Sequence, residues 1–238
     1  MTVVALVPAR DRADTVAATV AAALTVPGVS RVVVVDDASR DRTGAEAAAA
    51  GADVVRLAVN AGKGGAVAAG LAHAGDADVV LLLDADLGAT AAEAVGLLAP
   101  VLAGEVDATV GLFPAAGGRG GLGLVRDLAA AGIEEATGWR PRAPLSGQRA
   151  VRADMVRSLA LAPRFGLEVG MTVDLLRAGA SVREVPVAMD HRHTGRSLAG
   201  FAHRARQGRD VLAALVARIG ARRTLRVGIA TVRRRLAP

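Results

Sequence analysis

The sequence predicts an α/β fold in which a mostly parallel sheet is flanked by helices, and three observations support this prediction. Short apolar runs alternate with Ala-rich helical stretches from Val3 to Gly111, at a spacing that favours right-handed crossovers between parallel strands. The run 79–83 is apolar at every position, as is typical of a central strand covered on both faces. Polar loops follow these strands, and the carboxyl ends of parallel strands meet at one edge of a sheet.

The elements of the first half are defined by apolar runs and helical spacing. We predict strands at Val3–Val7, Arg31–Val35, Asp53–Leu57, Val79–Leu83 and Asp107–Gly111. Helices are predicted at 13–24, at 44–50, from the Gly-rich turn after Asn60 to His73, and near 90–103. In the first helix, apolar residues recur at i, i+4 and i+8, and Pro27-Gly28 ends it.

The second half is predicted to be more helical. Helices are expected near 124–137, 152–160, 170–178, 198–219 and 222–235. Two short strands, Ser181–Val185 and Val187–Asp190, are separated by Pro186, which places them at a sheet edge or bulge because proline lacks an amide proton. We expect an α/β domain over residues 1–200 and a basic, amphipathic helical extension over 201–238.

Composition narrows the class of protein. The 238 residues are 52% hydrophobic and 22% charged, which is typical of a globular chain. No window approaches the ~20 uninterrupted apolar residues of a membrane-spanning helix. The N-terminus lacks a signal-peptide pattern and cysteine is absent, so a cytoplasmic location is expected. With one Trp, three Phe and no Tyr, the chain offers few rings for stacking on bases, and we expect no nucleic-acid partner.

Positive charge is concentrated in the C-terminal tail. Residues 192–238 carry twelve arginines and one aspartate, a net charge of +11, whereas the whole chain carries +6. One interpretation is an anionic membrane surface as partner, with the protein peripheral on the inner face of the cell membrane. The other is a helix packed on the domain with a solvated arginine face, and the sequence leaves both open.

Two carboxylates one residue apart follow the central strand. Asp84 and Asp86 would project the same way if the chain stayed extended, and they would repel unless a cation lay between them. Carboxylate oxygens suit Mg²⁺ or Mn²⁺, so we predict a divalent metal site; the alternative is an ordinary polar turn.

The loops after the other strands add candidate binding groups. Lys63, the only lysine, lies in a Gly-rich turn whose backbone can approach phosphate closely, although the turn lacks P-loop spacing. Asp37 is a candidate for recognising a nucleobase or ribose, with helix capping as the alternative. Glu168 is a candidate general base, with a stabilising position at a helix start as the alternative.

Together, a set of short motifs resembles the family-2 glycosyltransferases of the GT-A fold over roughly residues 2–200, and is most similar to polyprenyl-phosphate sugar synthases of the dolichyl-phosphate mannose synthase type. The motifs are Val7-Pro8-Ala9, Val35–Thr43, Asn60–Ala66, Asp84-Ala85-Asp86-Leu87, Ser146-Gly147-Gln148-Arg149, Glu184–Val187 and Arg192–Ser197.

The resemblance implies a metal-dependent transfer of a sugar from a UDP- or GDP-linked donor. Its implied nucleotide-sugar residues are Pro8, Ala9, Arg10, Asp37, Lys63, Asp84, Ala85 and Asp86. The residues expected at the acceptor or its phosphate are Ser146, Gln148, Arg192, Arg196 and Ser197. Asp86, Glu168 and Arg192 are expected to be catalytic, and His191 is a further candidate metal ligand, as a late histidine is in several GT-A enzymes.

The expected acceptor is polyprenyl phosphate at the membrane surface. One alternative is a small soluble acceptor, as in glucosyl-3-phosphoglycerate synthase-like proteins. Two others are a nucleotidyltransferase and a non-catalytic nucleotide-sugar-binding protein. The chain departs from the mannose synthases at Gly88, where a glutamine is usual, and at Arg10, where an acid is common. The base, the sugar, retention or inversion, and the presence of a homodimer stay open.

Overall fold

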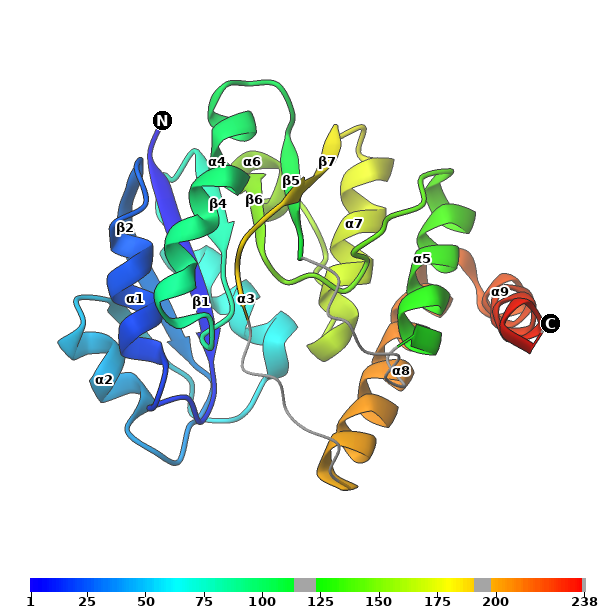
Figure 1. The fold of residues 1–238 in the computed structure, drawn as a ribbon, viewed down its shortest axis with the longest axis horizontal. Coiled ribbons are helices and arrows are strands. Elements are labelled where there is room, and N and C mark those ends of the chain that lie inside the picture. Colours follow the sequence, from blue (N-terminus) through cyan, green and yellow to red (C-terminus); the bar gives the residue numbers. More distant parts are fainter. Residues whose placement is uncertain (114–122, 191–197, 237–238) are drawn as a thin grey trace.

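The structure is a computed structural model and describes residues 1–113, 123–190 and 198–236. Within these residues, seven strands form one sheet in the order β3-β2-β1-β4-β6-β5-β7 (Figure 1). The strands are β1 (Val3–Ala9), β2 (Val29–Asp36), β3 (Asp53–Arg56), β4 (Val79–Leu82), β5 (Ala108–Leu112), β6 (Arg149–Arg152) and β7 (Val182–Pro186).

The sheet is mostly parallel because helices connect its first four strands. β1 pairs in parallel with β2 and β4, and β2 pairs in parallel with β3. β6 is inserted between β4 and β5 and runs antiparallel to both. The carboxyl ends of β1, β2, β3 and β4 therefore share one edge, which we call the carboxyl edge. It comprises the loops 10–15, 37–42, 57–61 and 83–87.

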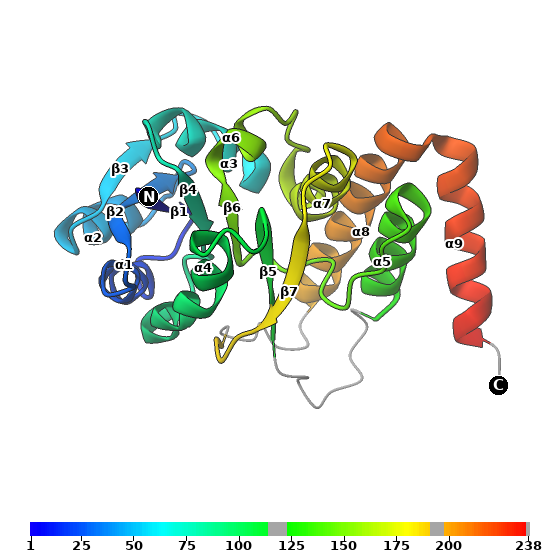
Figure 2. The ribbon, with the colours of Figure 1, turned by 90° about the horizontal axis from the view of Figure 1, so that it is seen from above.

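Helices cover both faces of the sheet (Figure 2). On one face, α1 (Val16–Leu24), the 3₁₀ helix η1 (Gly88–Ala94) and α4 (Val95–Leu102) share an apolar cluster with alternate residues of β1. On the other face, α3 (Gly62–His73), α6 (Ala153–Arg157) and α7 (Leu167–Arg177) share a second cluster with Val4 and Leu6 of that strand. This alternation follows from the two-residue period of a strand buried on both sides. α2 (Thr43–Ala49) lies beside α1.

A further helical layer covers α7. It contains α5 (Gly123–Thr137), α8 (Leu198–Ile219) and α9 (Ala221–Leu236), which share an apolar cluster with α7. Gly132 of α5 permits close packing, because a β-carbon there would lie 2.4 Å from Leu215 of α8. Arg218 of α8 is bound to the carboxylate of Asp174 of α7, with Nε at 2.9 Å from Oδ1. α8 is thus packed on the main body, and the division of the chain at residue 200 stays a prediction.

The structure confirms the α/β fold, the mostly parallel sheet and the two C-terminal helices. The prediction of a strand at Val187–Asp190 is wrong, because β7 ends at Pro186, on an edge strand where proline is tolerated. The helix expected near 152–160 is shorter and covers Ala153–Arg157. The strand β6, directly before it, was not anticipated. No helix in the described ranges is long and apolar enough to cross a membrane.

Candidate functional site

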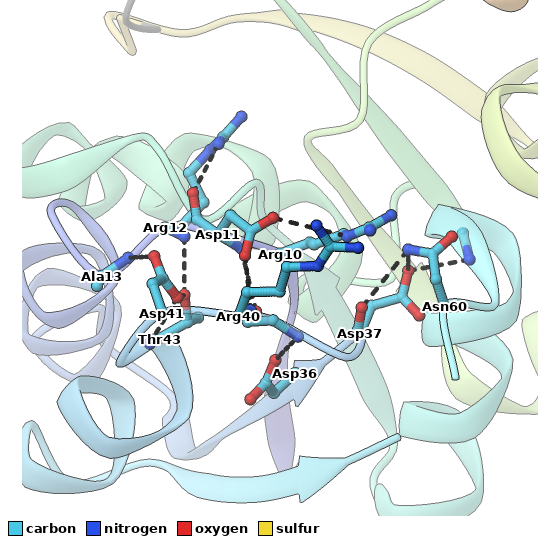
Figure 3. A network of polar contacts seen from close by, with 12 residues as sticks. Arg10, Asp11, Arg12, Ala13, Asp36, Asp37, Arg40, Asp41, Thr43 and Asn60 are labelled. Atoms are coloured by element: carbon cyan, nitrogen blue, oxygen red, sulfur yellow. Dashed lines mark hydrogen bonds and ion pairs between the residues drawn. The ribbon is translucent and has the colours of Figure 1, made fainter. Parts of the chain in front are cut away.

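The loops after β1 and β2 are joined by hydrogen bonds at the carboxyl edge (Figure 3). The backbone amide of Asp11 donates to Ser39 Oγ at 3.0 Å, and that of Arg12 donates to Thr43 Oγ1 at 2.8 Å. In return, the amide of Arg40 donates to Asp11 Oδ1 at 2.8 Å. These reciprocal bonds fix the two loops relative to each other, as the rim of a binding site requires.

Backbone strain occurs in the same two loops. Asp11 has φ of 51° and Ala38 has φ of 56°, both in the left-handed region. This region costs a residue with a β-carbon roughly 1–2 kcal/mol, and such strained positions cluster at functional sites. Ala9 and Arg10 precede the first strained position: Ala9 accepts a hydrogen bond from the amide of Asp37, and Arg10 is exposed (Figure 3).

Asp37 connects the second loop to the third. Its carboxylate accepts hydrogen bonds from Asn60 Nδ2 at 2.8 Å, from the amide of Ala61 at 2.6 Å and from the amide of Gly62 at 2.9 Å. Asp37 is buried, so these contacts position the start of α3, which carries Lys63. A role of Asp37 in recognising a base stays a prediction.

Lys63 lies between two carboxylates. Its Nζ is 2.6 Å from Asp84 Oδ1 and 2.8 Å from Glu168 Oε1. Burial by itself would lower the pKa of Lys63, but the charges of Asp84 and Glu168 outweigh it and hold that pKa above its usual value. A β-carbon at Gly147 would lie 2.3 Å from Nζ, so a larger residue there would displace the ammonium.

Gln148 holds the second oxygen of Asp84. Its Nε2 donates to Asp84 Oδ2 at 2.6 Å, while its Oε1 accepts from the amide of Asp84 at 2.9 Å. The Gln148 side chain is fully buried and committed to Asp84. It therefore positions this carboxylate, and a contact with an acceptor stays a prediction.

Asp86 lies in a turn, so the extended conformation considered for Asp84–Asp86 is not what the chain adopts. The turn is fixed through Ala85, whose carbonyl accepts from Thr15 Oγ1 at 2.9 Å and from Thr19 Oγ1 at 3.1 Å. Asp86 Oδ2 is 3.8 Å from Arg12 Nε, which links the fourth loop of the carboxyl edge to the first.

Arg149 is a buried cation that sequence reasoning did not single out. Its Nε donates to the carbonyl of Ser146 at 3.0 Å and its Nη1 donates to Thr172 Oγ1 at 2.9 Å. Its Nη2 and the Ser146 hydroxyl have no hydrogen-bond partner among the described residues. Burial lowers the pKa of Arg149 to about 10, against the opposing charge of Glu168. A small cavity beside it is also lined by Pro8, Lys63, Asp84 and Glu168.

Four of the expected site residues, His191, Arg192, Arg196 and Ser197, lie outside the described residues. The residue before them, Asp190, donates its amide to Thr90 Oγ1 in η1 at 3.2 Å. In the part of the chain that the structure describes, no three His, Cys, Asp or Glu side chains form a ready metal cluster. Asp84 and Asp86 nevertheless supply the hard oxygen donors that Mg²⁺ and Mn²⁺ prefer, and such ions often complete their shell with substrate phosphate oxygens.

Known proteins resemble this chain in both sequence and fold. The family described as glycosyl transferase family 2 matches residues 4–151. Among solved structures, glucosyl-3-phosphoglycerate synthase of Mycobacterium tuberculosis with phosphoglyceric acid is 30% identical, with a TM-score of 0.77, over 92% of this chain and 80% of that chain.

The same enzyme with Mg²⁺ and UDP is 29% identical, with a TM-score of 0.78, over 92% of this chain and 79% of that one. With Mn²⁺, UDP-glucose and phosphoglyceric acid, it is 28% identical, with a TM-score of 0.76, over 92% of this chain and 80% of that one. No curated protein matches the chain. Since the family match covers more than half of the sequence, the chain belongs to glycosyl transferase family 2.

Proposed function

We propose that this glycosyltransferase moves a sugar from a UDP-linked donor to a small phosphorylated acceptor, of the class of phosphoglyceric acid. The observation that carries the proposal is the likeness, over 92% of the chain, to an enzyme captured with UDP-glucose, Mn²⁺ and phosphoglyceric acid. The polyprenyl phosphate expected from the sequence is thereby disfavoured as the acceptor. It is the second candidate, supported by the basic tail alone.

The donor is proposed to lie along the carboxyl edge. The nucleoside would contact the loop that begins with Pro8, Ala9 and Arg10, and Asp37 would be available to its base or ribose. The diphosphate would lie near Lys63, because an ammonium at a helix start with two glycines after it can approach phosphate closely.

Asp84 and Asp86 would hold a divalent ion, Mg²⁺ or Mn²⁺. Such an ion neutralises the charge that develops on the leaving diphosphate. Gln148 keeps Asp84 oriented through two hydrogen bonds, and Thr15 and Thr19 fix the intervening carbonyl. Gln148 and the start of α1 therefore hold in place the turn that carries the two proposed metal-binding carboxylates.

Glu168 is proposed to act on the acceptor. A phosphorylated hydroxy acid attacks through a hydroxyl group, which must lose a proton, and Glu168 Oε1 or Oε2 would accept it. Lys63 Nζ lies 2.8 Å from Glu168 Oε1 and so orients this carboxylate. The anionic groups of such an acceptor would be met by Arg192 and Arg196, with Ser146 and Ser197 as hydrogen-bond donors.

The donor is tested by calorimetric titration of UDP and GDP, with and without Mn²⁺. We expect Mn²⁺-dependent binding of UDP, at least tenfold weaker in Asp86→Ala and unchanged in Asp76→Ala. Asp76 is an exposed acid in the loop before β4, at the opposite edge of the sheet. Binding that ignores both the metal and the Asp86 substitution would remove the chemical basis of the proposal.

The acceptor is tested with labelled UDP-glucose and two acceptors, 3-phosphoglycerate and polyprenyl phosphate. We expect the wild type to transfer glucose to 3-phosphoglycerate. The variant Glu168→Gln should lose this turnover but still bind UDP. Transfer to polyprenyl phosphate alone would replace the proposed acceptor by the second candidate. Binding of UDP without transfer to either would refute the proposed acceptor class.

A further inference from the structure

The last helix, α9, lies at the outer end of the molecule, away from the sheet (Figures 1 and 2). One side of it is packed: Thr224, Val227 and Thr231 are buried. These side chains face α5 and α8, with which α9 makes its contacts. Arg235 Nε also binds Asp127 Oδ2 of α5 at 2.9 Å, which fixes the rotation of α9 about its axis. The helix therefore presents one defined face to the outside.

That outer face carries an apolar ridge. Leu225, Ile229 and Val232 are 65%, 46% and 42% exposed. Their spacing of i, i+4 and i+7 places them in one line along the helix. A contiguous line of exposed apolar side chains rimmed by charged residues is typical of an interaction surface.

Arginines flank the ridge. Six occur in α9, at positions 222, 223, 226, 233, 234 and 235, and the helix contains no acidic residue. All six are exposed, and among the described residues Arg235 alone of them forms an ion pair. The helical spacing of i, i+4 and i+11 places three of these arginines in a line beside the ridge, namely Arg222, Arg226 and Arg233. The face is therefore apolar along its centre and cationic along its side.

We propose that α9 docks this face on an anionic lipid bilayer, lying parallel to the membrane plane. Leu225, Ile229 and Val232 would enter the boundary between headgroups and acyl chains, and the neighbouring arginines would contact lipid phosphates. The proposal concerns a surface distant from the carboxyl edge and holds for either acceptor class.

The charge on α9 decides between this partner and the alternatives. In a homodimer formed through this face, arginines of one copy would meet arginines of the other, with no carboxylate in the helix to pair with them. A nucleic acid would match the charge but not the aliphatic ridge, since binding of single strands relies on aromatic stacking. An anionic bilayer satisfies both the charge and the apolar side chains.

The test is flotation of the full chain with vesicles of phosphatidylcholine, alone or with phosphatidylglycerol. One variant carries Leu225→Ser and Ile229→Ser; another carries Arg222→Gln, Arg226→Gln and Arg233→Gln. Two controls are matched. Leu24→Ser with Val95→Ser removes comparably exposed apolar side chains from α1 and α4. The second control carries Arg31→Gln, Arg152→Gln and Arg183→Gln, and so removes the same amount of positive charge from exposed positions of the sheet.

We expect the wild type to float with anionic vesicles and not with neutral ones. Partitioning should fall at least tenfold in the ridge variant and on the order of a hundredfold in the arginine variant, since each arginine near an anionic surface contributes about one fivefold factor. Both controls should stay within about twofold of wild type.

The proposal would be overturned if the wild type did not float, or if it floated equally with neutral vesicles. It would also be overturned if the control variants reduced flotation as much as the α9 variants do. A dimer that becomes a monomer in the ridge variant, with no change in flotation, would assign the ridge to a second copy. Tight RNA binding that both α9 variants lose, again without vesicle binding, would assign the face to nucleic acid. Far-UV circular dichroism of each variant verifies that α9 is still folded.

Discussion

Replacing Lys63 by methionine leaves two carboxylates without the ammonium that lies between them. Glu168 is 6% exposed, so its charge would be buried without a partner. Removing one member of a buried ion pair typically costs about 3–5 kcal/mol. Asp84 keeps its hydrogen bonds from Gln148 and is 26% exposed, so solvent relieves part of the loss. We therefore expect a value near the lower end, about 3 kcal/mol at pH 7.

Urea unfolding at pH 7 and 9 measures this loss. At pH 7, we expect the midpoint of Lys63→Met to fall by about 1 M, because the two carboxylates lose the cation between them. In the wild type, the pKa of Lys63 is raised above its usual 10.5. The stabilising contribution of the Lys63 ammonium is therefore complete below pH 10.5 and is lost only as the pH rises through the folded-state pKa. The contact of Lys63 with the two carboxylates thus adds no pH dependence of stability between pH 7 and pH 9.

The matched control is the double variant Lys63→Met with Glu168→Gln, which removes both charges. It should recover more than half of the lost stability, because the buried group is then neutral. A single variant as stable as wild type, or a double variant no more stable than the single one, would refute the assignment of a buried, charge-balanced cluster.

Three further predictions test other contacts of the fold. Asp107 accepts hydrogen bonds from the amide and the hydroxyl of Ser181, and these bonds lower the pKa of Asp107. In thermal unfolding at pH 7, Asp107→Asn should cost about 1 kcal/mol of stability. This difference from wild type should vanish as the pH falls below 3.8 and through the folded-state pKa. Gly147→Ala should displace the lysine ammonium and weaken metal-dependent UDP binding about tenfold by calorimetry, whereas Gly96→Ala, with open space around its β-carbon, should be neutral or stabilising. Arg218→Ala should cost about 3 kcal/mol in urea unfolding, because it leaves a partly buried carboxylate of α7 unpaired; a loss below 0.5 kcal/mol would mean that α8 is only loosely attached.

The core strands could be predicted because their sequences are apolar and rich in β-branched residues. β1, β2 and β4 are buried on both faces, and each begins and ends within two residues of the predicted position. The largest extension at a strand start is in β2, which pairing with β1 carries back to Val29. β6 could not be predicted from local pattern: it has four residues, two of them arginines, and is held by its antiparallel partners on both sides. Such a strand exists because of tertiary context, which a local sequence pattern does not report.

The candidate site was predictable to the extent that topology determines it. Once parallel strands are assigned, the loops carrying Asp37 and Asp84 must share an edge. The partners of these residues depend on side-chain placement in other elements. Nothing in the spacing of Thr15 and Thr19 distinguishes them from ordinary helix residues, yet both bind the carbonyl between the two aspartates. Likewise, the burial of Arg149 depends on α7 covering β6, which appears only when the chain is folded.

The arrangement around Asp84 connects stability with ligand binding. One oxygen of this carboxylate contacts Lys63 and the other contacts Gln148, so its negative charge is already balanced in the structure. A divalent ion bound by Asp84 would bring a second positive charge next to the ammonium, which is unfavourable unless further negative charge arrives with it. A nucleoside diphosphate supplies that charge, and it also gives Lys63 a new partner. We therefore expect the ion and the nucleotide to strengthen each other's binding, so that in the calorimetric titration Mn²⁺ alone binds weakly and UDP alone binds weakly. The contrary result would be Mn²⁺ or UDP binding as tightly alone as in the presence of the other ligand. The ion would then bind next to the Lys63 ammonium without added negative charge, and the charge balance inferred from these contacts would be incorrect.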